Sequence, residues 1–212
     1  MASELFSDVA KIAEFMDVAK RVRHVEGWLS DTEGYLLYRL ARDGEGQGAI
    51  VEVGSWMGLS TAWLAAGSKA AARERVHAVD VFDGGPMLKG SDVVPDEGTT
   101  YHRFVENLEG LGLFDQVEPI VAESAAAARG WTGGAIRLLF LDGDHRYPGV
   151  KADFDLWSPY VPLGGVVVLD DSTDAYPGVV QLFREILAEG RQWQHVLRTG
   201  KTETLRRIGL PA

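Results

Sequence analysis

The chain has 212 residues, of which 46% are hydrophobic and 25% charged, with a formal net charge of -10 and no cysteine. This length supports one substantial hydrophobic core, so we expect a single domain over residues 1–212. The lack of cysteine excludes disulfides and thiolate chemistry, and the acidic balance argues against a nucleic-acid partner, because binding phosphates requires a basic surface.

Apolar segments are short throughout the chain. The longest purely apolar runs resemble strands, as at 165–169, and the first residues do not join a basic region to an apolar one. A membrane span needs roughly 20 consecutive apolar residues. We therefore expect a cytoplasmic protein that does not bind membranes and whose partners are small molecules.

Two helices are predicted at the start of the chain. Apolar residues recur at helical spacing in the first of them, at Leu5, Val9, Ile12, Met16 and Ala19. The pair Ser30 and Glu33 is typical of a capping box that opens the second helix. The polar segment 43–48 ends this part, so we interpret residues 1–46 as a helical cover placed before the sheet.

From residue 49 the sequence alternates between strands and helices. Strands are predicted at 49–53, 76–81, 116–121, 136–142 and 165–170, and helices at 59–72, 101–111, from 124, at 148–160 and at 176–189. Such alternation predicts an α/β fold with parallel strands and helices on both faces. The tail differs, because 193–198 and 202–208 are joined by a turn at Gly200 and Lys201, which predicts an antiparallel hairpin.

One irregular segment, 83–100, follows the second predicted strand. It contains six glycines and prolines, at Gly84, Gly85, Pro86, Gly90, Pro95 and Gly98. Ligands bind near the carboxyl ends of strands in open α/β sheets. The segment is interpreted as a lid or substrate loop, and a surface insertion is the equal alternative.

The segment from Ile50 to Thr61 is the most informative motif. It has the pattern of a buried strand that ends in an acid, Glu52, followed by a glycine turn at Gly54 and Gly58 that opens a helix. Such a turn brings the backbone close to a ligand at a helix N-terminus. A dinucleotide site would need glycine where Trp56 stands, so the pattern favours another nucleotide-like cofactor.

The pattern ExGxxxGxS resembles the first motif of class I S-adenosylmethionine-dependent methyltransferases, especially the small-molecule O-methyltransferases. The resemblance implies a Rossmann-like, mostly parallel seven-stranded sheet with a C-terminal antiparallel hairpin and N-terminal helices. It also implies a set of cofactor-binding residues, Glu52, Gly54, Ser55, Trp56, Gly58, Ser60 and Thr61.

Two later strand ends add to this cofactor site. Asp80 ends the second predicted strand, where an acid can accept hydrogen bonds from both ribose hydroxyls; a turn cap is the alternative role. In the resembling family the residues after the third strand line the adenine. There Ala122 and Glu123 depart from the usual glycine and aspartate, so the resemblance carries over to Ser124 alone.

Carboxylates also follow the fourth and fifth predicted strands. Asp142 ends one strand, and Asp170 with Asp171 ends the other. If these parallel strands are neighbours, the three acids converge at one edge of the sheet. Crowded carboxylates repel one another unless a cation joins them, which favours a hard divalent ion such as Mg²⁺.

This block resembles the DGDH and GGxxxxDD segments of macrocin-like and cephalosporin-hydroxylase-like proteins and, more distantly, of catechol O-methyltransferases. The resemblance implies that Asp142, Asp170 and Asp171 hold a metal ion. The register among Asp170, Asp171 and Ser172 stays open. Asp142 is also counted among the cofactor-binding and the catalytic residues.

His145 is the candidate general base. An alcohol attacks a methyl sulfonium poorly unless its proton is removed, and His145 follows Asp142 by three residues. Capping of the next helix is the alternative role. Trp28 and Trp56 are both candidates to cover the cofactor or the substrate; ordinary packing is the favoured role for Trp28 and not for Trp56.

Together these motifs predict a methyltransferase, and divalent-metal-assisted O-methylation of a hydroxylated natural product, sugar or phenol is the favoured activity. Two alternatives stay open, a nicotinamide-dependent oxidoreductase and a methyltransferase-like binding protein without activity. A homodimer is a further option, because covering helices in this fold family often come from a dimer partner.

Overall fold

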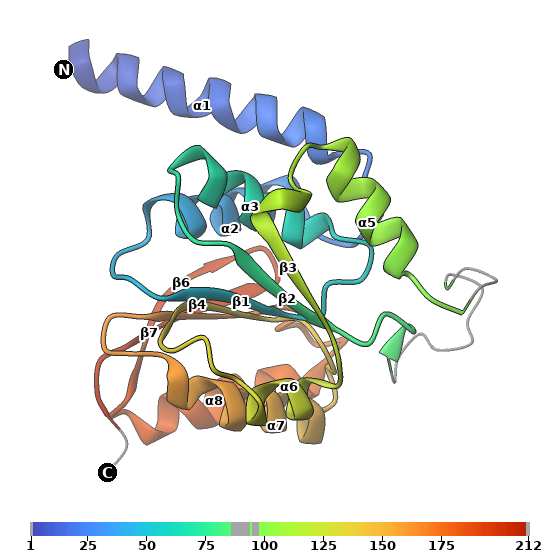
Figure 1. Cartoon of the computed structure of the whole chain (residues 1–212). Helices are drawn as coiled ribbons and strands as arrows, with labels where there is room; N and C mark the ends of the chain where they lie inside the picture. The colour runs from blue at the N-terminus through green and yellow to red at the C-terminus, as the bar shows by residue number, and fades with distance from the viewer. Residues whose placement is uncertain (1, 86–93, 95–97, 211–212) are drawn as a thin grey trace.

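A seven-stranded sheet lies between two layers of helices (Figure 1) in this computed structural model, which describes residues 2–85, 94 and 98–210. Its strands are β1 (Ala49–Val53), β2 (Val76–Asp80), β3 (Val117–Val121), β4 (Ile136–Leu141), β5 (Val166–Leu169), β6 (Trp193–Thr199) and β7 (Thr202–Arg207). They are ordered β3-β2-β1-β4-β5-β7-β6. The pairs among β1 to β5 are parallel, and β7 pairs antiparallel with β5 and β6. The predicted fold class and hairpin are confirmed.

Helices cover both faces of the sheet (Figure 1). One layer contains α1 (Ala2–Val22), α2 (Asp31–Asp43), α3 (Leu59–Ala70) and α5 (Tyr101–Gly110), and the other contains α6 (Ser124–Arg129), α7 (Tyr147–Trp157) and α8 (Pro177–Glu189). Short 3₁₀ turns span Phe114–Gln116 and Ser158–Tyr160. Within the described part of the chain, no helix combines the length and apolar character needed to cross a membrane.

Local chemistry explains where the helices begin and end. The predicted capping box is present, because the Ser30 backbone N–H donates to Glu33 Oε2 and Glu33 N–H donates back to Ser30 Oγ. The helix predicted at 148–160 ends earlier, at Trp157. Pro159 has no N–H to donate to the preceding turn, so the α-helical hydrogen bonds stop and a 3₁₀ turn completes the segment.

The order of the strands determines where a ligand can bind. Crossovers run in opposite directions on the two sides of the β1 and β4 pair, which leaves a crevice at the carboxyl ends of these strands. The two strand ends are joined directly, since Asp142 N–H donates to the Val53 carbonyl at 2.8 Å. The first residues of the predicted lid, Asp83, Gly84 and Gly85, line this edge, and most of the segment 83–100 lies outside the described residues.

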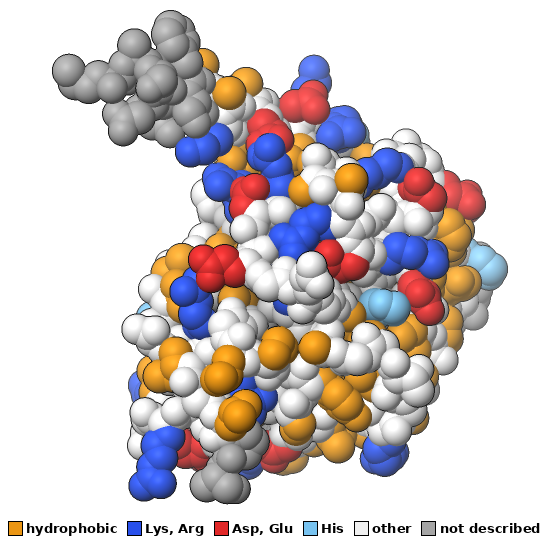
Figure 2. All heavy atoms as spheres, turned by 60° about the vertical axis from the view of Figure 1, so that its left-hand side comes forward, with side chains coloured by type: hydrophobic (Ala, Val, Ile, Leu, Met, Phe, Trp, Pro, Cys, Tyr) orange, Lys and Arg blue, Asp and Glu red, His pale blue; other side chains and the backbone are white. Residues whose placement is uncertain are grey.

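Figure 2 shows the side of the molecule that is on the left in Figure 1. Among the described side chains of this face, acidic and basic groups are interspersed over the upper half instead of forming a patch of one sign. A broad basic surface, as nucleic-acid binding requires, is therefore not seen on this face.

The packing of α2 on α3 relies on a glycine. A Cβ atom at Gly34 would lie 2.1 Å from Nε1 of Trp63, which is 1% exposed and belongs to the hydrophobic core on this face of the sheet. We predict that Gly34→Ala lowers the free energy of unfolding by about 1–3 kcal/mol, because the indole must move within a close-packed core.

Glycine to alanine in a helix interior normally stabilises by about 1 kcal/mol. Gly110→Ala in α5 is the matched control, since no atom lies within 4 Å of the added methyl group. Urea denaturation of the two variants measures both effects. Equal or higher stability of Gly34→Ala would show that the indole is not confined as described.

Candidate active site

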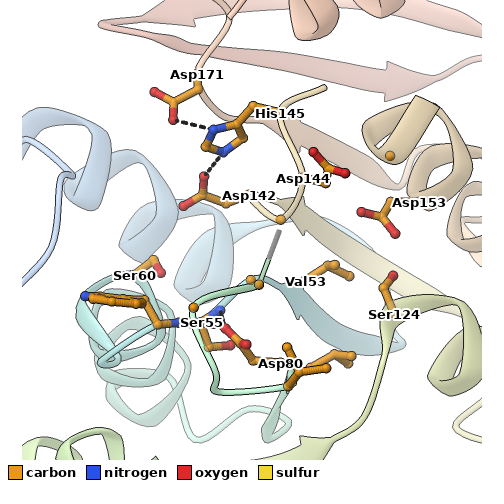
Figure 3. A pocket seen from close by; sticks show the side chains of 18 of the residues that line it. Val53, Ser55, Ser60, Asp80, Ser124, Asp142, Asp144, His145, Asp153 and Asp171 are labelled. Carbon is orange, nitrogen blue, oxygen red and sulfur yellow. Dashed lines mark hydrogen bonds and ion pairs between the residues drawn. The ribbon is translucent and has the colours of Figure 1, made fainter. Parts of the chain in front are cut away.

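A cavity of about 1040 Å³ opens at the carboxyl ends of β1, β2, β3 and β4. Figure 3 shows it from close by. Its described lining includes Trp28, Val53, Gly54, Ser55, Trp56, Ser60, Asp80, Ser124, Asp142, His145, Asp153, Asp171, Tyr176 and Lys201. Segments that are far apart in the sequence therefore meet around one space large enough for a nucleoside-sized ligand and a second small molecule.

The glycine turn after β1 forms one wall of the cavity. Gly54 has a φ of 87° and lies so close to β4 that a Cβ atom there would be 2.2 Å from the Asp142 carbonyl oxygen. Only glycine fits this position. Trp56, two residues later, has a φ of 48°, which is unusual for a bulky side chain and marks a strained turn.

Asp80 holds this strained turn in place. Its Oδ2 accepts hydrogen bonds from the backbone N–H groups of Ser55 at 2.7 Å and Trp56 at 2.9 Å, and its Oδ1 accepts from Phe82 at 2.7 Å. Asp80 also lines the cavity. A carboxylate oxygen has more than one lone pair, so the same group can still accept a hydrogen bond from a ligand.

Glu52 lies beneath the turn and is fully buried. Its Oε2 accepts hydrogen bonds from Ser55 Oγ, at 2.8 Å, and from Thr61 Oγ1. Burial raises the pKa of Glu52 to about 7, although the hydroxyl groups around it act in the opposite direction. Glu52 thus ties the strand end to the first turn of α3.

The predicted cofactor residues fall into two groups. Gly54, Ser55, Trp56, Ser60, Asp80, Ser124 and Asp142 belong to the cavity wall. Glu52, Gly58 and Thr61 are not part of the described lining; they lie under the loop and shape it. A direct cofactor contact by these three residues stays a prediction.

Acids from two strand ends meet at His145, as the strand order requires. His145 Nε2 lies 3.2 Å from Asp142 Oδ1, and Nδ1 lies 3.3 Å from Asp171 Oδ2, so the imidazole stands between the two carboxylates (Figure 3). Burial disfavours the charged ring, but the hydrogen bond that the ring donates to Asp142 and the charges of both acids outweigh it and raise the pKa of His145. The structure thus brings Asp142 and Asp171 together with His145, whereas the sequence predicts that Asp170 joins Asp142 and Asp171.

Asp170 points elsewhere. It is 1% exposed, and its Oδ2 accepts from Lys201 Nζ at 2.7 Å; the same ammonium donates to Asp171 Oδ1 at 2.7 Å. Burial, together with the charge of Asp142, raises the pKa of Asp170, whereas Lys201 opposes this shift. Burial disfavours the charged form of Lys201, but the charges of Asp170 and Asp142 and the hydrogen bonds to Asp170 and Asp171 outweigh it and raise the pKa of the lysine.

The predicted metal site is therefore only partly matched. Ligand atoms of Asp142, His145 and Asp171 lie within 4.8 Å of one another, a spacing that a metal ion could bridge. Among the described residues Asp170 stands outside this group, because its carboxylate faces Lys201. A divalent ion would fit Asp142, His145 and Asp171 better than the three aspartates.

Another acid lies at the far end of the cavity, near Ser124. Asp153 of α7 is 8% exposed, and burial raises its pKa to about 6 despite a hydrogen bond with Ser124. Trp157 Nε1 donates to Ser124 Oγ at 3.0 Å. Ser124 is therefore fixed in position between α6 and α7 (Figure 3).

Several cavity residues were not identified from the sequence. Lys201 and Tyr176 come from the hairpin turn and from the segment before α8, and Tyr176 packs edge-on against His145, with ring centroids 4.6 Å apart. Trp28, for which the sequence favours ordinary packing, lies at the cavity wall. Trp28 is 62% exposed and packs against Trp56 at the cavity, with ring centroids 5.5 Å apart. Lys201, Tyr176 and Trp28 belong to no recognisable sequence motif, so the sequence alone does not establish their place in the cavity.

The buried Glu52 predicts a measurable pH effect. Its pKa rises from 4.5 unfolded to about 7 folded, so between these values the folded state binds more protons and stability falls as pH rises. Glu52→Gln removes this titration. We predict that the variant gains up to about 3 kcal/mol relative to the parent protein between about pH 4.5 and about pH 7.

Urea denaturation of both proteins at several pH values measures this difference, in which the titration of other groups cancels. A stability difference that stays constant across this pH range would contradict the assignment of a raised pKa to Glu52.

Comparison with known proteins agrees with this geometry. A family model described as a methyltransferase domain matches residues 51–172. An uncharacterised protein of Acanthamoeba polyphaga mimivirus is 43% identical over 56 residues, which cover 26% of this chain and 25% of that protein. The chain therefore spans only a quarter of the length of this relative.

Solved structures share the fold at low sequence identity. The O-methyltransferase NovP has a TM-score of 0.71 at 19% identity, over 84% of this chain and 81% of its own. TomG from Streptomyces achromogenes, solved with S-adenosylmethionine, has a TM-score of 0.62 at 18% identity, over 94% and 90%. An O-methyltransferase from Bacillus cereus, solved with S-adenosylhomocysteine, has a TM-score of 0.61 at 19% sequence identity. The match covers 93% of this chain and 91% of that protein.

The family match includes Glu52, which lies under the glycine turn, and the cavity-lining acids Asp80, Asp142 and Asp171. The chain belongs to the methyltransferase-domain family and has the class I fold of S-adenosylmethionine-dependent methyltransferases.

Proposed function

We propose that this protein methylates a hydroxyl oxygen of a small molecule, such as a natural product, a sugar or a phenol. The observation that carries the proposal is the placement of His145 between two carboxylates on the wall of the same cavity as the glycine turn. The O-methyltransferase names of the structural neighbours agree with this activity. The expected homodimer and cytoplasmic location stay predictions.

S-adenosylmethionine supplies a methyl group on a positively charged sulfur. The residues that would hold it are Gly54, Ser55 and Trp56 in the turn, Asp80 at the ribose and Ser124 at the adenine. The missing Cβ of Gly54 lets the turn pack directly against the end of β4, and the Asp80 carboxylate lines the cavity with its position already fixed by three backbone N–H groups. Such preorganisation reduces the entropy lost on binding.

His145 is the residue proposed to take the proton of the acceptor. Asp171 lies beside Nδ1 and orients the ring, while Nε2 faces Asp142 and the cavity. To act as a base, the imidazole must be neutral, with its proton on Nδ1 beside Asp171 and none on Nε2. We propose that the acceptor hydroxyl replaces Asp142 at Nε2 and gives its proton to that nitrogen as its oxygen attacks the methyl group. Asp142 then stays beside the charged imidazolium and stabilises it.

Assistance by a divalent ion such as Mg²⁺ is the second candidate mechanism. The spacing of Asp142, His145 and Asp171 favours it. An ion there would lower the pKa of the acceptor hydroxyl and orient its oxygen. In this case His145 would be a metal ligand and not the base, so the two mechanisms assign different roles to His145.

The cofactor assignment predicts a loss of binding in Asp80→Ala. S-adenosylhomocysteine should stabilise the parent protein in a thermal-shift assay, and NAD should not. Removal of Asp80 leaves the N–H groups of Ser55 and Trp56 without their acceptor, so we expect the affinity for S-adenosylhomocysteine to fall at least about tenfold.

Asp115→Ala is the control, because this aspartate is exposed and pairs with Lys69 on the surface. Stabilisation by NAD with no response to S-adenosylhomocysteine would disprove the cofactor assignment.

The base assignment predicts the behaviour of His145→Asn with and without a chelator. Methyl transfer to a panel of phenols and sugars should fall by roughly 10²–10⁴-fold in the variant, while binding of S-adenosylhomocysteine is retained. His24→Asn, at an exposed position, is the control. If His145 is the base, the parent enzyme keeps its activity in excess chelator; loss of activity in chelator supports the ion-assisted mechanism instead.

A further inference from the structure

The turn between β6 and β7 brings a cation to the acidic site. Lys201 Nζ lies 2.7 Å from Asp170 Oδ2 and 2.7 Å from Asp171 Oδ1. The lysine side chain is 21% exposed, whereas those of Asp170 and Asp171 are 0% and 12% exposed. This ammonium is therefore a partly buried group shared between two adjacent carboxylates, unlike an exposed surface ion pair.

The backbone of Lys201 is held from two sides. Its N–H donates to Glu33 Oε1 at 2.7 Å, and its carbonyl accepts from Ser172 N–H at 2.9 Å. Gly200, with a φ of 57°, lets Glu33 approach, since a Cβ atom there would lie 2.3 Å from Glu33 Oε1. The cation is thus positioned by the helical cover on one side and by the acidic segment itself on the other.

The positive charge of Lys201 offsets the cost of burying the carboxylates of Asp170 and Asp171. Asp170 Oδ1 is buried without a hydrogen-bond partner among the described residues, and Asp142 adds a further negative charge nearby. Buried carboxylates are costly unless a positive charge is close. A fixed ammonium meets this need, and it also repels a divalent ion that approaches Asp171.

We propose that Lys201 is a built-in cation of this site, which holds Asp170 and Asp171, keeps Asp171 directed at His145 and weakens the binding of divalent ions. Lys201 is thus a positioning residue for the base. Its effect on catalysis rests on the proposed methyl transfer, but its effect on ion binding does not.

Direct ion binding tests the proposal. Mn²⁺ binding is measured by electron paramagnetic resonance on the full-length protein without substrate. We expect Lys201→Met to bind Mn²⁺ at least about tenfold more tightly than the parent protein, because the acids lose their competing charge. Lys201→Arg, which keeps the charge, should retain the weak binding of the parent.

Lys151→Met is the matched control, since Lys151 makes an exposed pair with Asp155 in α7. If Lys201→Met does not fold, Lys201→Gln keeps a hydrogen-bond donor without the charge, and the same increase is expected. Equal Mn²⁺ affinity in the parent and the uncharged variant would overturn the proposal.

A second measurement separates this inference from the proposed function. The uncharged variant should have a lower melting temperature in chelator and recover it in Mn²⁺, whereas the parent should respond little. Failure to bind S-adenosylhomocysteine would count against the proposed function and leave the Mn²⁺ comparison intact. A melting temperature of the uncharged variant that is unaffected by Mn²⁺ would count against Lys201.

Discussion

The close approach of the ends of β1 and β4 is the constraint on which the rest of the site depends. Asp142 N–H donates to the Val53 carbonyl, and Gly54 lies against the Asp142 carbonyl with no room for a Cβ atom. This contact turns the chain after β1 away from β4 and opens the crevice between them. The cofactor turn and the carboxylates then face one cavity, because each continues directly from one of the two joined strands.

Buried charge is the second organising factor. Glu52 supports the turn from below, Asp80 accepts its backbone N–H groups, and the acids beyond β4 and β5 are balanced by His145 and Lys201. Each carboxylate is paired with donors that fix a loop. Some acids of the site hold loops in place and others line the cavity, and a single acid such as Asp80 can do both.

The helical cover is coupled to the acidic site through Glu33. This residue completes the capping box of α2 with one carboxylate oxygen and accepts the N–H of Lys201 with the other. The start of α2 and the hairpin turn are thus held together by one buried side chain. A segment outside the family match thus contributes one of the contacts that position Lys201.

The sequence by itself determined the order of the elements, the parallel sheet with its terminal hairpin, the glycine turn and the acids at the strand ends. These features follow from local periodicity and from glycine and carboxylate positions, so they can be read without the fold. Only the tertiary structure decided that Glu52 lies under the turn and that Trp28 is exposed. It also decided that Asp170, a predicted metal ligand, pairs with Lys201 instead. The reason is physical. Lys201 is 31 residues from Asp170 in sequence, and a lone lysine shows no pattern until β7 pairs with β5 and brings its turn to the acids.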